Sequence, residues 1–200
     1  MTFSTSGILP AGWQTAFVGH AQRPGGGANH ADGTFTVRGS GRDIGERGQP
    51  IDNFQFASQS LNGDGEIKVR LATLVVKTRE PKVGIMLRES LAADSKNVAL
   101  LFNPQMGVRL SVRQKDGGSS SATANHTIKT APCWLKLVRK SDTVTGFQST
   151  DGAAWTQVGA PVTLAMPPKI LAGMPVTAGN RDESKLHTST FDNVTVTGSP

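Results

Sequence analysis

The stretch EIKVRLATLVV, Glu66 to Val76, decides the fold of this chain, because apolar and charged side chains alternate along its first half. Successive side chains of a β-strand point to opposite faces of the sheet. One face of this segment is apolar and carries Ile67, Val69 and Leu71. The opposite face carries Lys68 and Arg70, so the segment predicts a strand with one side in a core and one basic side in water.

Eight further segments show the same two-residue period and are separated by turn residues: GTFTVRG, FQFASQSL, VGIMLRES, VALLFNP, GVRLSVRQ, CWLKLVRK, TVTGFQS and FDNVTVTG. Almost nothing follows a helical period, and only SLAADSKN, Ser90 to Asn97, is expected to form a short turn of helix. Many short strands at regular spacing are typical of an all-β sandwich or barrel.

Composition favours one soluble domain. Hydrophobic residues make up 36% of the 200 residues, and no linker interrupts them, so we expect a single domain over residues 1–200. No apolar run is long enough to cross a membrane, and the N-terminus lacks the features of a signal peptide. Cys133 is the single cysteine, and its place beside Trp134 in an apolar run favours a buried thiol.

Seven segments between Gly12 and Val194 together carry a resemblance: GWQTAFVGH, GTFTVRGSGRDI, FQFASQSLNGDGEIKVRL, GIMLRES, WLKLVRK, STDGAAWTQVG and FDNV. The order and spacing of GIMLRES and STDGAAWTQVG are the specific part. The chain resembles bacterial modules of the concanavalin A-like, jelly-roll superfamily, in particular the DUF1349 and "regulation of enolase"-like domains. The resemblance implies an antiparallel β-sandwich of two sheets, extracellular, often a module of a larger carbohydrate-active protein, with a sugar-binding role.

The chain departs from that family at DIGERGQPID, Asp43 to Asp52. Relatives usually have a tryptophan after Asp-Ile and a shorter loop, whereas Gly45 occupies the position here. A ring that stacks on a ligand from this loop is therefore not expected.

Two segments that contain Asp-Gly could be either turns or binding sites. In STDGAAW, Asp151 and Gly152 are adjacent, unlike the sialidase Asp-box, and one carboxylate is too few for calcium, so a tight hairpin turn is expected with Trp155 packed beneath it. NGDGE, Asn62 to Glu66, is too short for an EF-hand and also predicts a hairpin turn. No cofactor is expected, although the family resemblance leaves a structural calcium open, with Asp52 or Asp192 as a contributor.

The sequence favours a binding module over an enzyme. Retaining glucanases on this type of sandwich place carboxylates as E-x-D-x-(x)-E, and no E-x-D occurs in the chain. The nucleophile motif G-x-S-x-G and the P-loop are also absent. A glycan-active hydrolase or lyase, or a structural or protein-interaction domain, remains the alternative.

The net charge of +6 favours a neutral or acidic polysaccharide or oligosaccharide as the partner. Nucleic acid is less expected, because few aromatic residues are interleaved with the cations. A sugar site needs an apolar ring beside planar hydrogen-bond donors. Alternation predicts such a site on one outer sheet face, formed by Met86, Arg88, Arg109, Arg113, Trp134 and Lys136.

Overall fold

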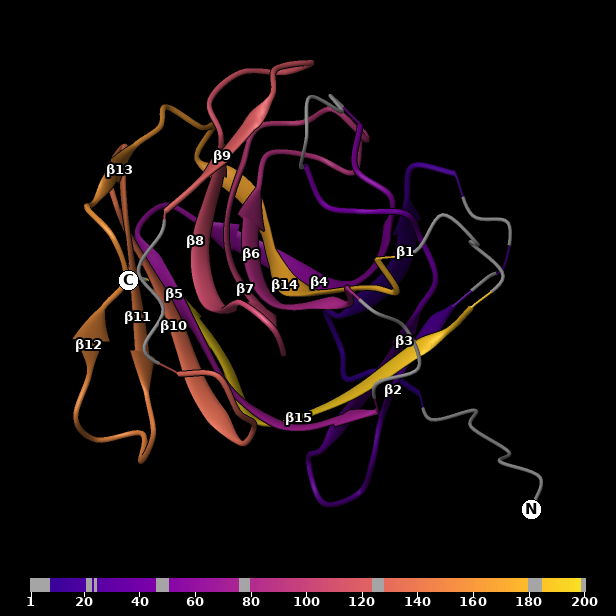
Figure 1. The fold of residues 1–200 in the computed structure, drawn as a ribbon. Coiled ribbons are helices and arrows are strands. Elements are labelled where there is room, and N and C mark those ends of the chain that lie inside the picture. Colours follow the sequence, from indigo (N-terminus) through magenta and orange to yellow (C-terminus); the bar gives the residue numbers. More distant parts are fainter. Residues whose placement is uncertain are drawn as a thin grey trace.

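The computed structural model describes residues 8–20, 23, 25–45, 51–75, 80–123, 128–179 and 185–198, and these form two antiparallel sheets (Figure 1). Sheet A has seven strands, in the order β1 (Gln14–Val18), β4 (Phe54–Asn62), β14 (Lys169–Thr177), β6 (Lys82–Arg88), β7 (Asn97–Asn103), β8 (Gly107–Arg113) and β9 (Ser120–Ala122). Sheet B has eight strands. Seven of them follow the order β12 (Thr156–Gln157), β11 (Thr143–Ser149), β10 (Cys133–Lys140), β5 (Gly65–Val75), β15 (His187–Gly198), β3 (Phe35–Gly39) and β2 (Gly26–Asn29). The eighth, β13 (Val162–Thr163), also pairs with β11.

All nine segments predicted as strands are strands, and they form β3 to β8, β10, β11 and β15. The strand β14 gave no such pattern, although it lies between β4 and β6 in the middle of sheet A. Its sequence, KILAGMPVT, contains Gly173 and Pro175, residues that are rare inside central strands. The pairing of β14 with β6 passes directly from Gly173 to Val176 and so leaves Pro175 out, which has no N–H to donate.

The helical turn expected at Ser90 to Asn97 is wrong. Residues 90–96 form turns and bends, and β7 begins at Asn97. The Arg88 guanidinium donates to the carbonyl oxygens of Ser90 and Ala92 at 2.5 Å each, which holds this segment against β6. Within the described residues there is no helix, and hence none that is long and apolar enough to cross a membrane.

The main core lies between the two sheets and confirms the predicted alternation. Ile67, Val69 and Leu71 of β5 are fully buried, as are Leu135 and Leu137 of β10. They pack against the inward side chains of sheet A, among them Val83, Ile85, Leu87, Val98, Leu100, Leu110 and Met174. Burying this apolar surface is the main favourable term for folding.

A second, smaller apolar cluster lies on the side of sheet A that faces away from sheet B. It contains Val18, Phe54, Phe56, Met86, Ala99 and Leu101 from the strands. Ile44, from the loop after β3, completes it and is 1% exposed, and Ala93 from the loop after β6 packs against it. The outer face of sheet A is therefore covered at this point by the protein's own loops.

Candidate functional site

The six residues predicted to form one ligand site lie on two different faces. Met86 and Arg88 are on β6 and Arg109 and Arg113 are on β8, on the outer face of sheet A, whereas Trp134 and Lys136 are on β10, on the outer face of sheet B. The prediction of a single site is wrong for this reason. Alternation correctly reports whether a side chain points into the core, but a sandwich has two outer faces, and alternation does not say which sheet a strand joins.

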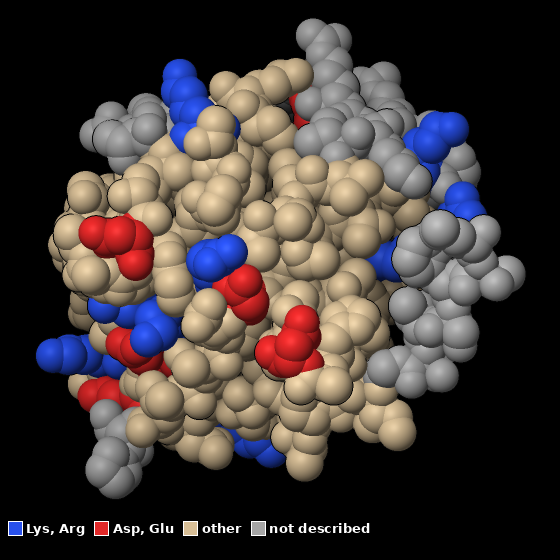
Figure 2. All heavy atoms as spheres, turned by 90° about the horizontal axis from the view of Figure 1, so that it is seen from below, with Lys and Arg blue, Asp and Glu red and all other residues tan. Residues whose placement is uncertain are grey.

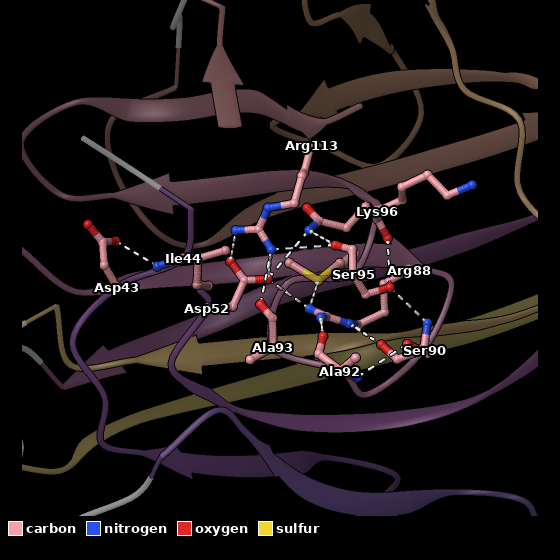
Figure 3. A network of polar contacts seen from close by, with 12 residues as sticks. Asp43, Ile44, Asp52, Arg88, Ser90, Ala92, Ala93, Ser95, Lys96 and Arg113 are labelled. Atoms are coloured by element: carbon pink, nitrogen blue, oxygen red, sulfur yellow. Dashed lines mark hydrogen bonds and ion pairs between the residues drawn. The ribbon is translucent and has the colours of Figure 1, made fainter. Parts of the chain in front are cut away.

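Arg88 and Arg113 are completely buried, so their predicted exposure is also wrong. Both guanidinium groups donate to the carboxylate of Asp52 (Figure 3), which lies in the segment before β4. Arg88 Nη1 is 3.1 Å from Asp52 Oδ2, and Arg113 Nη2 is 2.7 Å from Asp52 Oδ1. Arg113 Nη1 adds a second contact with Oδ2 at 3.0 Å, so that one carboxylate holds two arginines.

Other donors of the two guanidinium groups bind backbone carbonyls of the loop after β6. Arg88 binds Ser90 and Ala92, and Arg113 Nη1 is 3.0 Å from the Ala93 oxygen (Figure 3). Burial raises the pKa of the Asp52 carboxyl, and the charges of both arginines oppose that rise. Two guanidinium groups donating to both of its oxygens is the geometry of an ionised carboxylate. The network thus fastens two loops to sheet A and is not a surface for a ligand.

The other two residues predicted for the site on sheet A, Met86 and Arg109, do not offer fully exposed side chains to a ligand either. Met86 is fully buried in the small apolar cluster, with its sulfur 3.5 Å from Arg88 Nη1. Arg109 is half-buried. These residues are therefore separated from Trp134 and Lys136 by the whole thickness of the sandwich.

Gly45, which follows Asp43 and Ile44 in the loop after β3, has no room for a side chain. Its φ is +59°, and a Cβ built on it would lie 2.1 Å from Ser120 Oγ of β9 and 3.3 Å from Arg113 Nη2. The edge strand β9 and the buried arginine therefore occupy the space that a ring would need. Residues 46–50 of the same loop lie outside the described residues.

The outer face of sheet B brings together aromatic rings and a cation from two strands and a loop. Trp134 and Lys136 point outward from β10, and Phe147 of β11 is the direct register partner of Lys136. The Lys136 ammonium lies 5.2 Å from the centroid of Phe147 and 4.4 Å from the centroid of Trp155. All four side chains are partly exposed. We call these four residues the aromatic face.

Two of the four residues were not predicted as site residues. Phe147 lies on the outward side of the strand TVTGFQS, so the same alternation that selected Trp134 could have selected it. Trp155 follows the turn in STDGAAW and belongs to no strand, so no periodicity places it. Its position over Lys136 is a product of the loop that joins β11 to β12.

The Asp151–Gly152 segment lies in the predicted hairpin between β11 and β12, but the connection spans residues 150–155 and is longer than the tight turn expected, and it borders the aromatic face. Asp151 Oδ1 accepts the N–H groups of Ala153 at 2.8 Å and Ala154 at 2.9 Å, and these bonds lower the pKa of this exposed carboxyl. Gly152 has φ +78°, and a Cβ there would be 2.7 Å from Trp134 Cε2. Glycine is needed both for the backbone angle and because the Trp134 indole lies against the turn.

The hairpin turn predicted for NGDGE is wrong, because β4 ends at Asn62 in sheet A, β5 begins at Gly65 in sheet B and the two strands do not pair, so that this short turn carries the chain from one sheet to the other. Asp52 and Asp192, which were considered as calcium ligands, pair instead with arginines, Asp192 with Arg70 at 3.4 Å. Across the described part of the chain, no three His, Cys, Asp or Glu residues are grouped so that they could hold a metal ion. Cys133 is buried as predicted, and burial raises the pKa of its thiol to about 12.

No family model and no curated protein matches the sequence. Solved structures do match. A functionally unknown protein from Saccharomyces cerevisiae is 14% identical with a TM-score of 0.69, over 94% of this chain and 97% of that one. The carbohydrate-binding module CBM66 from Bacillus subtilis is 16% identical with a TM-score of 0.59, over 92% and 94%.

The Lotus tetragonolobus seed lectin is 10% identical with a TM-score of 0.53, and the match covers 97% of both chains. At these identities the likeness concerns the arrangement of strands alone. The described residues form two antiparallel sheets packed face to face, as expected for these neighbours. The chain therefore has the two-sheet β-sandwich fold of concanavalin A-like, jelly-roll proteins.

Proposed function

We propose that this protein is a non-catalytic carbohydrate-binding domain and that its aromatic face is the binding surface. The observation that carries the proposal is the partly exposed group of Trp134, Trp155 and Phe147 around the Lys136 ammonium. The similar structures include a carbohydrate-binding module and a lectin, which supports a sugar as the ligand class. We further propose a DUF1349-like grouping and an extracellular role, from the resemblance of the sequence.

The chemistry of the aromatic face suits a sugar ring. A pyranose has an apolar face of C–H groups, which packs on an aromatic ring, and a rim of hydroxyls, which need donors and acceptors. Lys136 supplies donors between two of the rings, and Arg70 stands beside Trp134 as its register partner on β5. The rigid sheet holds these groups in place before a ligand arrives, which reduces the entropy cost of binding.

Binding is tested by affinity electrophoresis and calorimetry against neutral polysaccharides (xylan, mannan, β-glucan, fructan) and acidic ones (polygalacturonate, alginate). Losing one stacking ring is expected to cost about 1–2 kcal/mol, or roughly tenfold in affinity. We expect Trp155→Ala and Trp134→Ala each to weaken binding by about that factor. The Trp155 ring lies against the Lys136 ammonium, and Trp134 precedes Lys136 by two residues on the same outward side of β10.

The matched control is Leu91→Ala, which removes an exposed apolar side chain from the loop over sheet A. It should bind like the parent. Trp134→Phe should recover part of the binding, since a smaller ring still offers a face. If the Leu91 variant loses as much affinity as the tryptophan variants, or if none of the variants differs from the parent, the aromatic face is not the site.

A further inference from the structure

A hollow lies on the same outer face of sheet B, at the opposite end of β10 from Trp134. Its volume is about 220 Å³, and its polar lining includes Asp64, Glu66, Lys140 and Thr197. Gly65 and Gly198 also line it, so that no side chain fills the space at these two positions. The register places Glu66 opposite Val138 on β10 and opposite Thr197 on β15, which brings the three strands to one point.

The polar groups of this hollow have unused hydrogen-bonding capacity. Asp64 accepts the backbone N–H of Ser141 through Oδ1 at 2.6 Å, which fixes its carboxylate at the rim. The side chains of Glu66, Lys140 and Thr197 have no polar partner among the residues that the structure describes. Two carboxylates that accept, an ammonium that donates and a hydroxyl that does both match the hydroxyl rim of a sugar.

A straight line on the surface joins the hollow to the aromatic face. The outward residues of β10 are Trp134, Lys136, Val138 and Lys140, while Cys133, Leu135, Leu137 and Arg139 point inward. At a rise of about 3.4 Å per residue, Trp134 and Lys140 are about 20 Å apart along the strand. That distance exceeds the size of one sugar ring several times over.

We propose that the hollow is a second subsite and that the ligand is a neutral oligosaccharide chain lying along β10 between Trp134 and Lys140. This rests on the proposed function. An acidic sugar is disfavoured in the hollow, because Asp64 and Glu66 would repel its carboxylate or sulfate. Charges are mixed elsewhere too: in Figure 2, which views the molecule from below, several Lys and Arg side chains lie beside Asp or Glu on a mostly uncharged surface.

The test compares chain lengths. Oligosaccharides of two and of six units are prepared from whichever neutral polysaccharide the parent protein retains, and their affinities are measured by calorimetry for the parent, Lys140→Met and Thr197→Val. Each variant removes donors from the hollow without touching the aromatic face. We expect both to bind the six-unit ligand several-fold more weakly, an effect of about one lost hydrogen bond, and the two-unit ligand as the parent does.

Lys115→Met is the matched control, since Lys115 is exposed in the loop after β8 of sheet A. It should leave both affinities unchanged. NMR adds an independent readout: the Val138 methyl groups should shift on titration with the six-unit ligand. Equal affinity of parent and hollow variants for the six-unit ligand, with Val138 unshifted, would overturn the subsite while leaving the aromatic face intact. A parent that binds only acidic polysaccharides also overturns it, and one that binds no saccharide overturns the proposed function as well.

Discussion

Replacing Asp52 by asparagine should be among the most damaging single changes of a polar residue in this domain. The carboxylate receives three contacts from two guanidinium groups, at 2.7, 3.0 and 3.1 Å, and all three side chains are fully buried. The neutral amide would leave two buried positive charges without a counterion. Breaking a buried ion pair by removing one partner costs about 3–5 kcal/mol. That is a large share of the roughly 5–15 kcal/mol by which domains are stable.

The free energy of unfolding is measured by urea titration with tryptophan fluorescence, and the melting temperature by circular dichroism. A loss of 3–5 kcal/mol corresponds to a fall in Tm of roughly 6–20 °C for a chain of this size. Asp192→Asn is the matched control, because Asp192 and Arg70 are 3.4 Å apart with side chains 26% and 38% exposed. It should cost under about 1 kcal/mol. If Asp52→Asn costs no more than Asp192→Asn, the two arginines do not depend on this carboxylate and the reasoning fails.

Three further outcomes are expected. Burial lowers the pKa of His187 from 6.5 to about 4, so between these pH values the unfolded chain binds a proton that the folded chain does not. The free energy of unfolding should therefore fall by about 3 kcal/mol as the pH drops from 6.5 to 4. Urea titrations of a His187→Asn variant at several pH values should lack this component. Gly152→Ala should destabilise the fold by about 1–2 kcal/mol and shift tryptophan fluorescence, because the methyl group meets the Trp134 ring at a positive φ; unchanged stability and emission would contradict the contact. The Cys133 thiol, with its pKa raised to about 12, should react with a thiol reagent only in denaturant, and rapid labelling of the native protein would show that it is accessible.

The sequence by itself determined which side of β5, β6, β8 and β10 faces the core between the sheets. Leu135 and Leu137 are fully buried while Trp134 and Lys136 are partly exposed, as alternation requires, because the pleat of a strand fixes side-chain direction locally. It also located the chain reversals at Asp64 and at Asp151, since glycine beside an acidic residue favours a turn, although it did not show that the reversal at Asp64 joins the two sheets. These features depend on a few neighbouring residues, and a single sequence contains them.

The tertiary structure alone decided which outward residues share a surface. Arg88 has the outward parity of an exposed residue, yet it is buried by Asp52, which lies 36 positions earlier in the chain, and Arg113 pairs with the same carboxylate across 61 positions. Trp134 has the same parity but joins the other sheet, where Trp155 and Phe147 lie within reach of Lys136. Strand order and loop packing arise from contacts between distant segments, and a two-residue period carries no information about them.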